Sequence, residues 1–167
     1  VRLEMLLEQV LAPEQYEANV KTKKGSSDIV EFAIKLPGKD EERGSVYLPI
    51  DAKFPQDAYH RLTDAYEAGD PDTIESATKN LDAVIRKMAR DIQEKYIDPP
   101  NTTEFGIMFL PFEGLFAEVI RRTNLMEQLQ RDYGILVTGP TTLAAILNSL
   151  QMGFKTLAIQ KRSSEVW

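Results

Sequence analysis

The segment from residue 105 to residue 139 constrains the fold most, because it has the pattern of a β–α–β unit. It opens with the continuous apolar run FGIMFLP and closes with a second short apolar run, GILVTG. Between them, EGLFAEVIRRTNLMEQLQRDY has helical spacing over residues 113–133. Strands that are apolar without alternation are typical of a sheet covered on both faces. We therefore expect an α/β protein with helices on both sides of its sheet.

Ahead of this unit, two β-rich runs predict an antiparallel hairpin. They are DIVEFAIKL (28–36) and VYLPIDAKF (46–54), separated by PGKDEERGS (37–45), whose proline, glycines and charges mark a solvated loop. QYEANVKTK (15–23) predicts one more short strand, which leads into a turn at 25–27. The even-numbered positions 30–36 and 46–52 are apolar, so each hairpin strand is expected to bury its even face.

The remaining segments predict long amphipathic helices. One begins at Gln56 and is broken at 69–71, where Asp70 can cap a second helix that runs down to Asp98. The polar face of this second helix is expected to be a solvated surface; it carries Lys79, Asp82, Arg86, Arg90 and Glu94. Residues 140–167 are interpreted as one helix with a heptad-like seam at Leu143, Leu147, Leu150, Phe154 and Leu157.

Both ends of the chain suggest a piece of a longer protein. The first helix starts without a capping residue, and the seam of the last helix is expected to continue beyond Trp167 into a coiled coil or to pack against the domain. The length of 167 residues suits one domain over 1–167. Coiled-coil flanks would allow self-association.

Composition excludes several kinds of site. There is no cysteine, so disulfides, zinc–thiolate sites and cysteine nucleophiles are excluded. His60 is the only histidine, so a metal would have to be a hard cation on carboxylates. The net charge of −6 argues against unspecific coating of nucleic acid but leaves room for a local basic groove. Without an apolar stretch of about 18 residues or a signal peptide, we expect a cytoplasmic location.

One group of residues has the types and placement for a reaction: Asp28, Asp51 and Lys53. Asp28 begins the first hairpin strand, and the other two end the second, on one face of it. The antiparallel register places residues between about 51 and 54 opposite Asp28, roughly 5 to 8 Å away. Two carboxylates at about 5 Å would repel by roughly 3 kcal/mol at an effective dielectric of 20, and a divalent cation reverses that sign.

The alternation of the strands opposes this arrangement. Because the even face is apolar, strict pleating would turn Asp28 away from Asp51 and Lys53. A turn or bulge at Gly25-Ser26-Ser27 would release Asp28 from the pleat. An Asp-x-Lys is also common by chance, so the residues alone leave open both a catalytic centre and ordinary surface charges.

Several spaced stretches together resemble the RmuC family of bacterial DNA recombination proteins over nearly the whole chain. They are SSDIVEFAIKLPG and VYLPIDAKFP, FLPFEGLFAEV, GILVTGPTTLAAILNSLQMGF and IQKRSSEVW. The resemblance implies the PD-(D/E)xK nuclease superfamily and a restriction-endonuclease-like α/β fold, a mixed sheet flanked by helices. Its proline-aspartate corresponds to Ser27-Asp28, and its acid-x-lysine corresponds to Asp51-Ala52-Lys53.

What the resemblance implies is a Mg²⁺-dependent DNA nuclease acting in recombination or repair, with Mn²⁺ as an alternative ion. Asp28, Asp51 and the backbone carbonyl of Ala52 would bind the metal, and Lys53 would assist the attacking water. Ser27 departs from the family's proline. The Gly-Glu pair that members usually carry in the first helix is missing, and Glu4 and Glu8 are weaker substitutes. Family members also tend to have an N-terminal membrane segment, so a tether outside this chain is expected.

Further contacts to DNA are expected at two places. Lys23 and Lys24 can meet its backbone, and the amides near Thr141 and Thr142, at a helix start directly after a strand, can hold a phosphate. A solvated turn explains the two lysines equally well, and ordinary helix capping explains Thr141 and Thr142 better than phosphate binding does. Two rival functions stay open: a non-cleaving DNA-binding or scaffolding domain on a degenerate nuclease fold, and an interaction module without nucleic acid.

Overall fold

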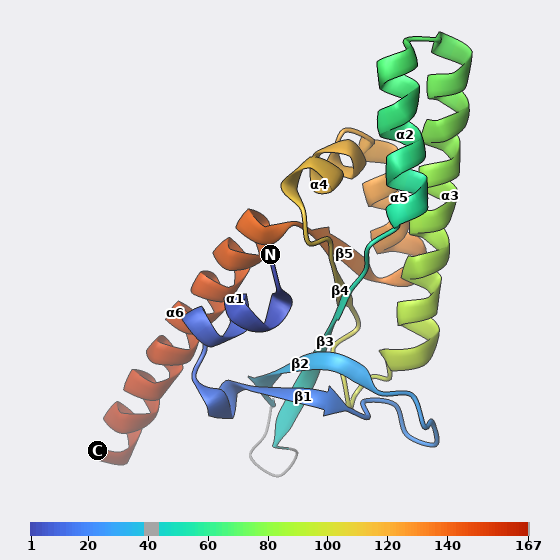
Figure 1. Ribbon diagram of the computed structural model, residues 1–167. Helices are drawn as coiled ribbons and strands as arrows, with labels where there is room; N and C mark the ends of the chain where they lie inside the picture. Colours follow the sequence, from blue (N-terminus) through green and yellow to red (C-terminus); the bar gives the residue numbers. More distant parts are fainter. Residues whose placement is uncertain (39–43, 167) are drawn as a thin grey trace.

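The computed structural model describes residues 1–38 and 44–166, and a five-stranded sheet lies at its centre (Figure 1). The strands lie side by side in chain order: β1 (Tyr16–Val20), β2 (Val30–Pro37), β3 (Ser45–Ala52), β4 (Gly106–Phe109) and β5 (Ile135–Thr138). β1, β2 and β3 pair antiparallel, whereas β3, β4 and β5 pair parallel. The expected mixed sheet is confirmed. Residues 39–43 of the predicted loop lie outside the described residues.

Helices cover both faces of the sheet (Figure 1). On one side lie α1 (Leu3–Val10) and α6 (Pro140–Val166), which share a core with the even-numbered side chains of β2 and β3. On the other lie α2 (Gln56–Ala68), α3 (Pro71–Tyr96), α4 (Glu113–Ile120) and α5 (Thr123–Tyr133). The single-turn helix Pro13–Gln15 links α1 to β1. The apolar strand β4 is covered from both sides, as its composition predicts, and β5 packs Ile135 and Val137 against the second group of helices.

The α2–α3 hairpin extends well past the sheet (Figure 1). Gly69 ends α2 with a left-handed φ of 74°, and the Asp70 carboxylate accepts a hydrogen bond from the Thr73 amide, so the predicted break and cap are confirmed. Most of the polar face of α3 is exposed as expected, but Asp82 is not. It is half-buried and paired with Arg122.

The single helix predicted for residues 113–133 is wrong, because the segment forms two helices. α4 ends at Ile120, and Arg122 has the non-helical dihedrals φ −96° and ψ 81°. Its guanidinium donates to the backbone carbonyl of Glu118 in the last turn of α4. That side chain satisfies a carbonyl that a continuing helix would have bonded, so the chain turns there.

The last helix is continuous, as predicted, with Gly153 inside it. Its seam passes from buried to exposed along α6. Leu143 and Leu147 are buried, Leu150 and Phe154 pack at the edge of the core, and Leu157 is exposed. Within the described residues, no helix combines the length and the apolar character that crossing a bilayer requires.

The hairpin register decides where the predicted site residues lie. Phe32 pairs with Ile50, and the next residues along the two strands are Glu31 and Asp51. β2 begins at Val30, two residues later than predicted, so Asp28 lies before the strand. The pleat therefore does not dictate the direction of the Asp28 side chain.

Candidate functional site

Asp51 and Lys53 stand at the carboxyl end of β3, where the strand is held by its parallel neighbour. Asp51 pairs with Met108 of β4, and the amide of Lys53 donates to the carbonyl of Phe109 at 2.9 Å. The backbone is therefore fixed on both sides of Ala52. Residues two apart on a strand share a face, and the Lys53 ammonium indeed lies 3.0 Å from Oδ2 of Asp51.

The Asp51 carboxylate is buried yet incompletely satisfied. The residue is 8% exposed, and among the described residues its Oδ2 atom accepts no hydrogen bond. The Lys53 ammonium is close enough for an ion pair, but its direction does not form a hydrogen bond. Buried carboxylate oxygens normally have donors, so this oxygen is an acceptor whose hydrogen-bonding capacity is unused.

Glu31 is the carboxylate that the hairpin brings toward Asp51. Residues opposite each other in an antiparallel pair lie about 4.5 to 5.5 Å apart at their Cα atoms, and Glu31 is one residue beyond Phe32, which pairs with Ile50 at the end of the β2–β3 ladder. The pKa of Glu31 is raised, first by partial burial and then by the negative charges of Asp51 and Glu4, while Lys53 opposes the shift. The side chain itself is exposed. The charged groups of Glu31, Asp51, Glu4 and Lys53 therefore influence one another at one end of the sheet.

Asp28 lies nearby in the turn that precedes β2. Its carboxylate accepts a hydrogen bond from the Ser26 hydroxyl at 3.0 Å, and its amide donates to the same oxygen at 3.1 Å. The side chain is exposed. Burial, followed by the charges of Asp51 and Asp28, raises the pKa of Tyr96 at the end of α3. The negative charges of Asp28 and Asp51 therefore both disfavour ionisation of the Tyr96 hydroxyl.

The oxygen atoms around Asp51 can be compared with the coordination that Mg²⁺ requires. Within the described ranges, no three carboxylate or imidazole side chains gather closely enough to form a metal cage. Mg²⁺ does not need one, because it usually binds one or two carboxylates and keeps several waters. Asp51 supplies a buried oxygen without a hydrogen bond, and Ala52 supplies a backbone carbonyl at the strand end. Asp51 with one further carboxylate, from Glu31 or Asp28, fits the ion.

A cavity of about 480 Å³ adjoins this strand end. Its lining combines the start of α1 with β1, β2, β3 and the segment after β4: Val1, Arg2, Leu3, Glu4, Ala18, Asn19, Glu31, Phe32, Ala52, Phe109 and Pro111. Glu4 of α1 thus faces the same space as Glu31. The cavity meets the end of β3 at Ala52, and Asp51 and Lys53 are not among its lining residues.

The other predicted contacts with DNA have partners within the chain. The Lys23 ammonium donates to the carbonyl of Glu94 at 2.7 Å near the end of α3, whereas the side chain of Lys24 is exposed. The Thr141 amide donates to Glu113 at 2.6 Å, so a phosphate would compete with a carboxylate there. The Thr142 hydroxyl caps α6 by accepting from the Gly139 amide at 2.8 Å. The role of these residues in DNA contact stays a prediction.

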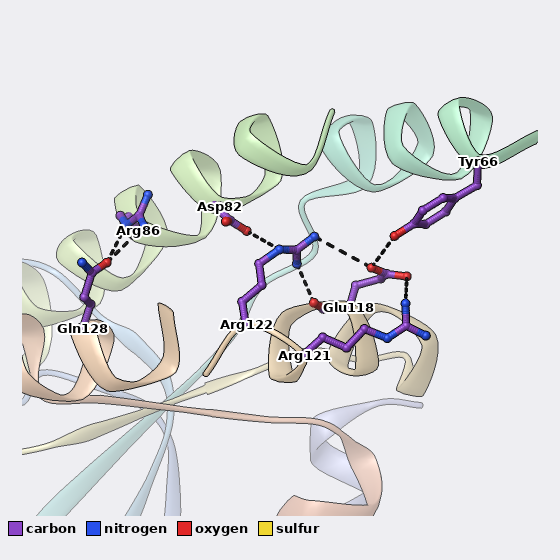
Figure 2. A network of polar contacts seen from close by, with 7 residues as sticks. All are labelled: Tyr66, Asp82, Arg86, Glu118, Arg121, Arg122 and Gln128. Atoms are coloured by element: carbon purple, nitrogen blue, oxygen red, sulfur yellow. Dashed lines mark hydrogen bonds and ion pairs between the residues drawn. The ribbon is translucent and has the colours of Figure 1, made fainter. Parts of the chain in front are cut away.

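A second charged group ties the α2–α3 hairpin to α4 (Figure 2). Arg122 lies 3.1 Å from Asp82 and 3.9 Å from Glu118, and its side chain is only 17% exposed. Glu118 also accepts from the Tyr66 hydroxyl at 3.0 Å and pairs with Arg121 at 3.2 Å. Burial raises the pKa of Asp82, and Arg122 opposes the shift. Among the described residues Oδ1 of Asp82 accepts no hydrogen bond, as is also true of Oδ2 of Asp51, but its carboxylate is balanced by the Arg122 guanidinium. The group links three helices, which indicates a structural role.

Sequence reasoning missed Glu31. It shares odd numbering with Asp51 and Lys53, which indicates a common face, and the predicted range of registers already allowed it opposite Asp51. The proline-aspartate correspondence drew attention to Asp28 instead. Alternation places Glu31 on the face of Asp51, and the assignment of Asp28 to the site stays a prediction.

Comparisons with known proteins agree on one family. The sequence pattern of the RmuC family matches residues 1–167. The "DNA recombination protein RmuC homolog" of Xylella fastidiosa (strain Temecula1 / ATCC 700964) is 50% identical over 167 residues, which cover 100% of this chain and 37% of that protein. The homolog of Chlamydia pneumoniae is 29% identical over 120 residues, or 71% of this chain and 27% of that protein. The chain thus spans well under half of these relatives. No solved structure matches.

Proposed function

The chain belongs to the RmuC family, and from this premise we propose that it holds a Mg²⁺-dependent centre for hydrolysing phosphodiester bonds in DNA. Mn²⁺ is the alternative ion. The relatives' names connect them with DNA recombination, and we extend that substrate to this chain. The net charge of −6 favours local contact with DNA at the site over broad coating of the strand.

The observation that carries the proposal is the buried Oδ2 atom of Asp51, which accepts no hydrogen bond from the described residues and lies 3.0 Å from the Lys53 ammonium. We assign Asp51 as the main metal ligand and the carbonyl of Ala52 as the second. The further carboxylate is Glu31 in preference to Asp28, because Glu31 directly precedes Phe32, the first residue of β2 paired with β3, and carries a pKa raised by burial and then by Asp51.

Each side chain has a distinct task in this proposal. A bound Mg²⁺ supplies positive charge at the phosphate and lowers the pKa of water. Asp51 holds the cation, while the Lys53 ammonium positions the attacking water or offsets the negative charge that develops on the phosphate oxygens. Glu31 restricts the position of the cation from the neighbouring strand. Lys53 can perform its task because the Phe109 carbonyl fixes its backbone.

Cleavage of labelled DNA by the full-length protein tests the proposal. We expect Mg²⁺-dependent cleavage that falls at least about a hundredfold in Asp51→Asn and in Lys53→Ala, as when one preorganised charge is removed. Lys79→Ala is the matched control, because Lys79 forms an exposed ion pair with Glu75 on α3. Its cleavage should stay at the wild-type rate.

Two outcomes would favour the rival functions. Salt-sensitive DNA binding without any cleavage by the wild-type protein would support a non-cleaving DNA-binding or scaffolding domain. Absence of both would support an interaction module that does not use nucleic acid.

A further inference from the structure

Two exposed phenylalanines flank the candidate site. Phe54 follows Lys53 directly after β3, and Phe112 precedes α4 just after β4. Their rings pack edge to face with centroids 5.0 Å apart, yet the residues remain 38% and 46% exposed. β3 and β4 are parallel neighbours, so both rings lie at the carboxyl edge of the sheet.

The surroundings of this pair combine apolar and polar groups. Ala52 and Pro111, which line the cavity at the strand end, are each within two residues of one of the rings. Phe54 also lines a separate hollow of about 500 Å³ together with Pro55, Gln56, Asp57, Ala58, Asn80 and Val84. The amides of Gln56 and Asn80 offer both donors and acceptors, which is what the edge of a nucleobase requires.

From this arrangement, and resting on the proposed function for the choice of DNA as ligand, we propose that Phe54 and Phe112 form a stacking platform for an unpaired base. Aromatic side chains bind single strands because every base has a π-face, whereas the bases of a duplex are already stacked on each other. The substrate class is therefore single-stranded DNA or a frayed end, with a base on the platform and its phosphate near Lys53.

The charge of the chain favours this mode of binding. A protein with a net charge of −6 is poorly suited to gain affinity from many lysine and arginine contacts with phosphates. Stacking on an aromatic ring does not depend on net charge. The platform would hold the strand beside a site whose own side chains include Glu31 and Asp51.

Fluorescence anisotropy with labelled oligonucleotides, measured on the full-length protein in EDTA, tests the platform. We expect Phe54→Ala and Phe112→Ala to weaken single-strand binding by roughly fivefold to a hundredfold and to change blunt-duplex binding by less than about twofold. Phe54→Tyr should bind as wild type, whereas Phe54→Leu should resemble the alanine variant, because leucine keeps apolar volume without a π-face.

A matched control and a modified strand make the test specific. Phe105 is 40% exposed but precedes β4 at the opposite end of the strand, so Phe105→Ala should bind as wild type. An abasic nucleotide at the stacked position should weaken binding to wild type and have little further effect on Phe54→Ala. Circular dichroism checks that each variant is folded.

Several results would overturn the platform. They are wild-type affinity in both alanine variants, wild-type affinity in Phe54→Leu, equal losses for duplex and single strand, or no DNA binding by the wild-type protein. Equal losses would point to a contact with DNA that does not need an unpaired base, and absence of DNA binding would point to an apolar contact with another protein at this edge. Cleavage of DNA is measured separately. If the protein does not cleave DNA but its single-strand binding still depends on Phe54 and Phe112, only the proposed hydrolysis is contradicted. If it cleaves DNA and binding does not depend on these phenylalanines, only the platform is contradicted.

Discussion

The ammonium nitrogen of Lys53 lies 3.0 Å from Oδ2 of Asp51, and that buried oxygen accepts no hydrogen bond from any described residue. A buried carboxylate in this state is held by one charge and lacks the donors that usually compensate for lost water. Both its contribution to stability and its affinity for a cation follow from this pair.

Removal of the Lys53 charge should destabilise the fold. Lys53→Met would leave Asp51 buried without an ion-pair partner, and we expect a loss of about 1–3 kcal/mol in the free energy of unfolding, measured with urea at pH 7. The exposed pair of Lys79 and Glu75 provides the comparison, because Lys79→Met should cost below about 1 kcal/mol. Equal losses in the two variants would show that Asp51 does not depend on Lys53.

Divalent cations should stabilise the protein through Asp51. At a Mg²⁺ concentration of about 100 times the dissociation constant, binding adds about 2.7 kcal/mol to the free energy of unfolding. Differential scanning fluorimetry should show a rise in Tm for wild type and none for Asp51→Asn. Glu31→Gln should reduce the rise more than Asp28→Asn does, and the reverse order would assign the second carboxylate to Asp28.

The raised pKa of Glu31 predicts a pH-dependent effect on stability. Burial and then Asp51 and Glu4 raise its pKa in the folded state, so its favourable contribution is present below its unfolded pKa and is lost as pH rises through the folded value. Without metal, Glu31→Gln should therefore have a slightly higher Tm than wild type at pH 7. The gain should stay below about 0.5 kcal/mol, because the exposed side chain is screened by solvent. A gain in Tm for Glu31→Gln that is larger at pH 3 than at pH 7 would contradict a raised pKa of Glu31.

Arg122 should matter more for stability than its neighbour Arg121. Arg122 is 17% exposed and pairs with both Asp82 and Glu118, whereas Arg121 is 68% exposed (Figure 2). We expect Arg122→Ala to lower the free energy of unfolding by about 3 kcal/mol, because it leaves the partly buried Asp82 without its ion-pair partner and removes the bond to the Glu118 carbonyl. Arg121→Ala should cost below about 1 kcal/mol. Similar urea midpoints for the two variants would contradict the structural role.

Much of the fold follows from local patterns in the sequence. The apolar runs around Ile107 and Val137 predict buried parallel strands, and Asp70 with Pro71 predicts the start of α3. The division of residues 113–133 into two helices could not be predicted, because it depends on Arg122 reaching Glu118 and the distant Asp82. The helical spacing of apolar residues carries no information about such a long-range contact.

The site was predictable only in part for a related reason. Asp51 and Lys53 are two residues apart on one strand, so their shared face follows from the pleat. The partner across the hairpin depends on register, which the loop at 37–45 left uncertain by several residues. The pairing of Phe32 with Ile50 resolves it and brings Glu31 into the site.

The central claim is that Asp51 holds a divalent cation at the end of β3, and a crystal structure of the full-length protein soaked in Mn²⁺ tests it most directly. We predict an anomalous peak within coordinating distance of Oδ2 of Asp51 and the carbonyl of Ala52, with a carboxylate of Glu31 directed at it. A fully soaked crystal with no ion at Asp51, and with Oδ2 contacting Lys53 alone, would contradict the account.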